Sequence, residues 1–290
     1  MEYLGYLLIL LFSVLNLCES IVVKRYAHRH GSGGPILNSI TALFALVFFL
    51  VTDKGGFFVP DGMIYYAMAN AVFYAAGFHL TFVAFKCGPF GLTKLLSTFS
   101  LLFPIFYGIF VLKEEGGYMI YLCIAMIFVS VFLINQKKSN AESVTGISLK
   151  WFICIFFSVV SNGFISIITR AQQIRFDDAC SNEFSVFSLA GAFILMMVLG
   201  FITERDKMGR VFKSGTLYGA AAGIFNGAKN FITLAIYLYL PLSVISPIKS
   251  GLNIVLTFAT ALLIYKERYT LRQTVGVALG AAAVIILALK

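Results

Sequence analysis

The chain has 290 residues, of which 60% are hydrophobic and 12% are charged. A soluble domain has roughly a quarter charged residues, so this composition, with a mean hydropathy of +0.91, argues against a water-soluble fold. The formal net charge of +9 does not indicate nucleic-acid binding, because the basic residues occupy short gaps between apolar runs instead of one basic face.

Ten runs of the chain are long and apolar enough for membrane-spanning helices, which need about 20 mainly apolar residues. Short gaps with Gly and Pro separate most of the runs, as expected for turns. The sequence therefore predicts an all-α integral membrane protein with ten transmembrane helices. In chain order, the predicted spans cover residues 3–23, 34–52, 63–85, 90–112, 118–135, 151–169, 184–203, 214–239, 242–265 and 274–289.

The longest polar gap lies near the middle of the chain. We predict a first five-helix repeat at residues 1–136, a linker at 137–149 and a second five-helix repeat at 150–290. A shift of 152 matches three alanines of the third span with three glycines of the eighth, namely Ala67, Ala71 and Ala75 with Gly219, Gly223 and Gly227. A shift of 145 matches Phe12, Ser13, Val14 and Arg25 with Phe157, Ser158, Val159 and Arg170.

Because five spans is an odd number, the second repeat enters the membrane from the opposite side. Inverted repeats of this kind allow transporters to build one site between two halves that alternate in accessibility. We therefore predict two inverted five-helix repeats around a central cavity between spans 1, 3, 4, 6, 8 and 9. A duplicated scaffold without transport activity is the alternative.

Sequence motifs recur at the ends of corresponding spans. The first half contains FVAFKCGP at 82–89, LLFPIF at 101–106 and LKE at 112–114, and the second contains AIYLYLP at 235–241, IYKE at 264–267 and Gly276. This pattern resembles the EamA-type repeat of the drug/metabolite transporter superfamily over essentially the whole chain. The resemblance implies a ten-helix carrier for amino acids, other metabolites or drugs. The second half departs from the pattern, because Pro247 stands early in its span and nothing matches Pro104.

The eighth span combines a polar stripe with a glycine stripe. A charge inside a span costs about 2.5–3.5 kcal/mol on insertion scales, so Lys229 near the middle of this span requires a reason. Its neighbours at helical spacing complete a stripe of candidate substrate-binding residues, Asn226, Lys229, Asn230 and Thr233. The opposite side carries Gly215, Gly219, Gly223 and Gly227, a small-residue pattern that predicts close packing on another helix.

Further polar residues occur in spans that the repeat places around the same cavity. The remaining candidate substrate-binding residues are Lys249, Ser250 and Asn253 in span nine, Tyr74 in span three and Asn16 in span one. Glu19 and Lys94 are candidates for a gate or for ion coupling, because we expect them to lie at similar depth and to pair. Arg170 is expected at a helix end, where its side chain reaches toward the membrane surface.

These charges favour an anionic or carboxylate-bearing substrate. If Glu19 neutralises Lys94, then Lys229 and Lys249 remain for a ligand. We predict a secondary transporter that moves a small polar metabolite, such as an amino acid or organic acid, by alternating access. The alternatives are an exporter of cationic or lipophilic drugs that uses Glu19, and a non-transporting membrane scaffold.

The sequence contains no signature of an enzyme or a metal site. The five Cys residues are scattered, and His28 and His30 have no Cys, Asp or Glu nearby. We therefore predict no catalytic residue, no metal and no cofactor. The expected partners are a small-molecule substrate, the lipid bilayer and a coupling ion, either proton or sodium, with the chain acting as a monomer or homodimer and not binding nucleic acid.

The expected location is the bacterial inner membrane, which the chain crosses several times. Most Lys and Arg residues lie in loops after odd-numbered spans, so the positive-inside rule puts both termini outside. The family resemblance puts them in the cytoplasm instead.

Overall fold

The computed structural model describes residues 2–52, 58–111, 148–176, 180–237, 242–266 and 270–288, together with 122, 125, 126, 129, 130 and 133. Helices are the only regular secondary structure in these residues. The elements in chain order are α1 Glu2–His30, α2 Gly34–Thr52, α3 Met63–Cys87, α4 Phe90–Ser97, η1 Thr98–Leu101, α5 Leu102–Phe110, α7 Leu149–Phe176, α8 Ser181–Thr203, η2 Arg205–Lys207, α9 Met208–Tyr237, α10 Leu242–Leu263 and α11 Leu271–Ala288. Most of the predicted fifth span and linker lies outside the described residues.

Five of the described helices are long and apolar enough to cross a membrane, judged by length and composition. They are Leu4–His30, Gly34–Thr52, Met63–Cys87, Leu149–Phe176 and Ser181–Thr203. Large apolar side chains on the outside of the bundle are highly exposed, with Leu217 at 81% and Leu271 at 82%. Several polar side chains, such as Asn70 and Asn226, are buried instead. An apolar exterior around a partly polar interior suits a helical membrane protein.

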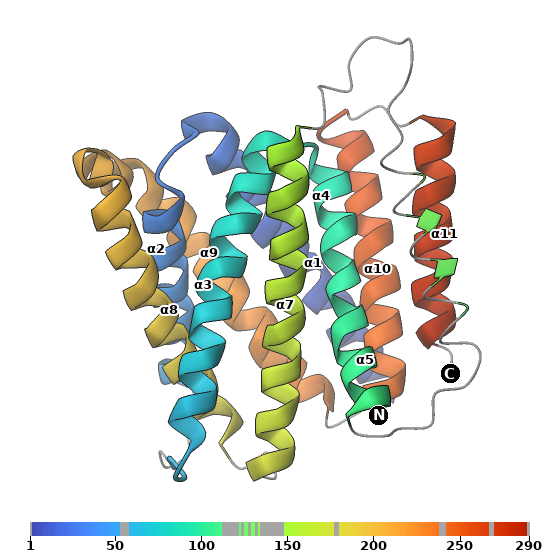
Figure 1. Ribbon diagram of the computed structural model, residues 1–290, viewed down its shortest axis with the longest axis horizontal. Helices are drawn as coiled ribbons and strands as arrows, with labels where there is room; N and C mark the ends of the chain where they lie inside the picture. The colour runs from blue at the N-terminus through green and yellow to red at the C-terminus, as the bar shows by residue number, and fades with distance from the viewer. Residues whose placement is uncertain are drawn as a thin grey trace.

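The helices form one roughly aligned bundle (Figure 1). α1 begins and α11 ends at the lower end of this view, where the N and C marks lie, whereas α7 begins at the upper end. α1 and α7 therefore cross the bundle in opposite directions. α1 packs against α9 and α10, α3 packs against α7 and α8, and α2 packs against α8 and α9.

The glycine stripe of α9 packs against α2, as the sequence predicted. A methyl group at Gly219 would lie 2.7 Å from Ile40 Cγ2, and one at Gly223 would lie 2.6 Å from Phe44 Cβ. Such separations leave no room for a side chain. The close contact turns the opposite face of α9, which carries Lys229, toward the interior of the bundle.

The predicted fourth span is interrupted, because the chain forms α4, the 3₁₀ segment η1 and α5 in place of one continuous helix. Two hydroxyls near the break bond to backbone carbonyls, Ser97 Oγ to Thr93 O at 2.8 Å and Ser100 Oγ to Ser97 O at 2.9 Å. Pro104 has no backbone N–H, so the carbonyl of Ser100 has no α-helical donor. These local features favour the tighter turn at this position.

α1 continues to His30, about two turns beyond the predicted end of the first span. Lys24 is consequently inside a helix and 7% exposed. Its ammonium donates to the carbonyl oxygens of Phe85 and Gly88, at 2.6 Å each. Lys24 thus satisfies backbone acceptors at the C-terminal end of α3, which lack partners within their own helix.

α11 also packs within the chain. Ser130 donates a hydrogen bond to the carbonyl of Gly276 at 2.6 Å, and a methyl group at Gly280 would lie 2.7 Å from Ser130 Oγ. Gly276 and Gly280, four residues apart in α11, therefore serve a contact inside the monomer.

Candidate functional site

A cavity of about 660 Å³ lies inside the bundle, and side chains from α1, α3, α4, α5, α7, α9 and α10 line it. These elements belong to the six spans that the sequence placed around a cavity. α2 and α8 also contribute, through residues such as Thr41 and Ser185. The predicted site residues that line the cavity are Asn16, Glu19, Tyr74, Lys94, Lys229, Asn230, Thr233, Lys249 and Asn253.

Glu19 forms its ion pair with Lys229, so the predicted pairing of Glu19 with Lys94 is wrong. The contact joins Glu19 Oε2 to Lys229 Nζ, and the two side chains are only 11% and 15% exposed. Because α1 packs directly on α9, the Lys229 ammonium reaches the carboxylate. Lys94 reaches a neighbouring residue, Asn16.

Asn226 stands behind this pair and does not line the cavity. Its side chain is 3% exposed, and Nδ2 donates to Glu19 Oε1 at 2.9 Å. Its Oδ1 accepts a hydrogen bond from Asn230 Nδ2 at 3.1 Å. Asn226 therefore orients the Glu19 carboxylate, in contrast to its predicted role as a substrate ligand. The side chain of Ser250, another predicted ligand, lies outside the described residues.

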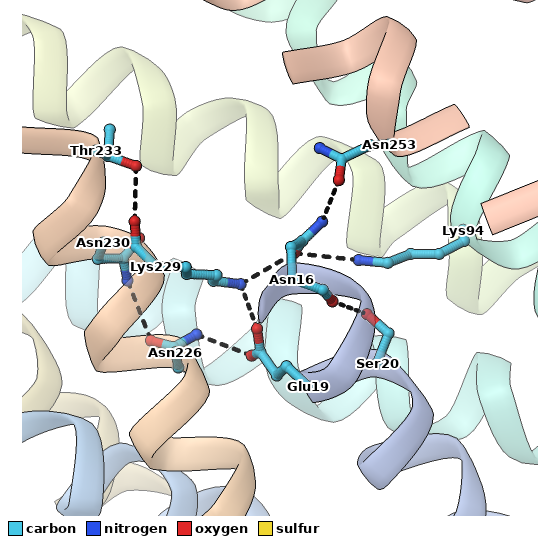
Figure 2. Close-up of polar contacts among 9 residues, drawn as sticks. All are labelled: Asn16, Glu19, Ser20, Lys94, Asn226, Lys229, Asn230, Thr233 and Asn253. Carbon is cyan, nitrogen blue, oxygen red and sulfur yellow. Dashed lines mark hydrogen bonds and ion pairs between the residues drawn. The ribbon is translucent and has the colours of Figure 1, made fainter. Parts of the chain in front are cut away.

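Asn16 links α1 to three other elements of the site (Figure 2). Its Oδ1 accepts hydrogen bonds from Lys229 Nζ at 3.2 Å and from Lys94 Nζ at 3.4 Å. Its Nδ2 donates to Asn253 Oδ1 at 3.2 Å. The Asn16 amide thus accepts hydrogen bonds from the ammonium groups of both Lys94 and Lys229. Because it is neutral, it does not compensate the charge of either lysine.

Lys249 approaches the site from α10. Its Nζ donates to Thr233 Oγ1 at 3.0 Å and lies 3.6 Å from the centroid of the Phe12 ring, within the range of a cation–π contact. Within the described part of the chain, neither Lys94 nor Lys249 forms an ion pair with a carboxylate. The region around Asn16 therefore holds three lysines and one carboxylate, and Lys94 takes the place of Lys229 as a lysine available to a ligand.

The polar face of α7 is not among the predicted site residues. Arg170 lines the cavity, because α7 continues to Phe176 and carries this residue well before its end. The prediction that its side chain reaches out from a helix end is therefore wrong. Further polar residues of α7 that line the cavity include Asn162, Ser166, Thr169 and Gln173. Their spacing of three or four residues is helical and readable from the sequence.

Comparison with known proteins supports the fold and leaves the activity open. No protein-family model and no curated protein matches the sequence. A solved structure, described only as a crystal structure of a protein, resembles this chain with a TM-score of 0.65 and 15% identity. The similarity covers 99% of this chain and 96% of that chain, so the two share an overall fold.

Proposed function

We propose that the protein is a secondary transporter that moves a small organic anion, such as an organic acid or amino acid, through a lipid bilayer. The observation that carries this proposal is the polar cavity within apolar helices, lined by Lys94 and Lys249 without carboxylate partners among the described residues. Charged side chains inside a membrane are costly and usually mark a substrate or ion pathway. A bound anion offsets the two charges.

Ten spans in two inverted repeats are part of the proposal. Exchanging the halves maps the contact of α1 with α9 onto that of α7 with α3, and the contact of α2 with α9 onto that of α8 with α3. Four positions of α1 that line the cavity also correspond to positions of α7 that line it. The offset in residue number is 146, one more than the shift of 145 that matched the sequences of these two spans. The positions are Asn16, Glu19, Ser20 and Val23 in α1, and Asn162, Ile165, Ser166 and Thr169 in α7.

This symmetry supports alternating access, because two equivalent halves can exchange which end of the cavity is open. Membership of the EamA-type transporters and a location in the bacterial inner membrane remain proposals that rest on the sequence motifs. Any energy coupling uses a proton or sodium gradient or substrate exchange. An exporter of cations is less favoured, since Lys229 and Asn226 already occupy both Glu19 oxygens.

Purified protein in liposomes tests the proposal. Vesicles preloaded with one organic acid at a time are diluted into trace radiolabelled acid, and counterflow is recorded. We expect wild-type vesicles to accumulate label, and Lys249→Gln vesicles to accumulate far less. Lys150→Gln, which removes an exposed lysine at the start of α7, is the matched control. Movement of a lipophilic cation with no movement of any acid would contradict the proposal.

A further inference from the structure

Arg170 is a cation on the α7 wall of the cavity, apart from the lysines around Asn16. It lines the cavity and forms no ion pair with any described residue. The hydroxyls and amides of Ser166, Thr169 and Gln173 surround its position on the same helix face. α7 therefore presents a charged group together with neutral hydrogen-bonding groups that suit an anion.

One hydrogen bond fixes the level of Lys94 relative to α7. The indole Nε1 of Trp151 donates to Thr93 Oγ1 at 2.9 Å, which places the residue next to Lys94 beside the beginning of α7. Arg170 lies about five helical turns further along α7, roughly 28 Å at 1.5 Å per residue. The backbones of Lys94 and Arg170 therefore lie at distant levels of the cavity. The ammonium of Lys94 extends from its level to Asn16 of α1, and Arg170 enters the cavity near the other end of α7.

The size of the cavity agrees with an extended ligand. Its volume of about 660 Å³ is in the range of pockets that hold drug-sized molecules. Its lining also includes two aromatic side chains, Tyr74 and Phe78, together with Asn162. Such a wall accommodates an apolar or weakly polar body between two charged ends.

We infer that the substrate is an extended organic anion with an acid group at each end, one bound near Lys94 and Lys249 and the other by Arg170. This inference rests on the proposed transport function and names the substrate class of the same cavity. One acid group leaves either Arg170 or the lysines without a counter-charge, whereas two separated groups supply both. Arg170 has the role of a specificity-determining residue, because it distinguishes two-headed anions from one-headed anions of equal length.

The test compares diacids with monoacids of matched length. Adipate, suberate and sebacate are titrated into purified wild-type protein by calorimetry, alongside hexanoate, octanoate and decanoate. We expect the longer diacids to bind roughly 10- to 100-fold more tightly than the matched monoacids, since the second acid group adds a charge-assisted contact. Arg170→Gln should remove this advantage, because diacid affinity should fall much more than monoacid affinity. Arg170→Lys should retain part of it.

Arg175→Gln is the matched control, because Arg175 lies on the same helix but is exposed and does not line the cavity. It should retain the full preference for diacids. Thermal unfolding of each variant verifies folding. Equal binding of diacids and monoacids by the wild type would overturn the inference, as would an equal loss of both ligand types in Arg170→Gln.

Uptake assays separate this inference from the proposed function. If diacids bind through Arg170 but are not transported, the proposed transport function is contradicted, whereas the inferred site for an anion with two acid groups stands. If a monoacid is transported equally well by the wild type and by Arg170→Gln, and diacids are not preferred, the proposed transport function stands. The inferred site for an anion with two acid groups is then overturned.

Discussion

The ammonium of Lys229 is paired with the carboxylate of Glu19, across 210 residues of sequence. We expect either single neutralisation, Glu19→Gln or Lys229→Met, to lower the free energy of unfolding by about 3 kcal/mol, because each leaves one largely buried charge without its partner. The double variant should lose less than the sum of the two losses. Chemical denaturation in detergent measures all four proteins, and strictly additive losses would contradict a direct interaction.

The neutral amide of Asn16 keeps Lys94 available to a ligand. Asn16→Asp has nearly the same shape and places a carboxylate oxygen where Lys94 and Lys229 donate. We expect anion binding to weaken about tenfold or more, since an internal carboxylate then competes with the ligand. The neutral variant Asn16→Ser removes the amide without adding charge and should weaken binding less. Calorimetry with suberate measures the affinity of both variants. An equal loss of affinity in the two would show that the added charge of the aspartate is not the cause of the weaker binding.

Lys94 and Lys249 are expected to favour function at the expense of stability. Lys94→Met and Lys249→Met each remove a charge that no described carboxylate offsets, so their melting temperatures should rise or stay constant. Uptake in liposomes should fall strongly for both variants, because the anion loses its counter-charge. The exposed Lys150 provides the control, and Lys150→Met should change neither property. A large loss of stability in the two cavity variants would instead indicate a structural role.

The contact between α9 and α2 depends on Gly223. A methyl group there would lie 2.6 Å from Phe44 Cβ and would also meet the carbonyl oxygen of Thr41. We expect Gly223→Ala to lower the free energy of unfolding by about 1–3 kcal/mol, because the two backbones must separate. Gly209→Ala is the control on the same helix, since nothing lies within 4 Å of that position. It should be neutral or slightly stabilising through better helix propensity. Equal thermal shifts for the two variants would argue against close packing.

Much of the architecture follows from local sequence properties. Long apolar runs predict helices whether or not their neighbours are known, and the spacing of Asn226, Lys229 and Asn230 places them on one face. The glycine stripe of α9 predicts a close helix contact for the same reason, and its contact with α2 confirms that prediction. The predicted positions of helix ends were less accurate. Polar residues such as Lys24 and Arg170 suggested loops, whereas α1 and α7 continue through them.

The sequence by itself determined the helical class and many of the residues that line the interior, although not the polar face of α7. These depend on composition and on helical periodicity within one segment. The tertiary structure decided that Glu19 pairs with Lys229 and that Lys94 hydrogen-bonds to Asn16. Both outcomes depend on the packing of helices far apart in the chain, and a change of one turn in helix register moves a side chain by about 5.4 Å, enough to exchange partners.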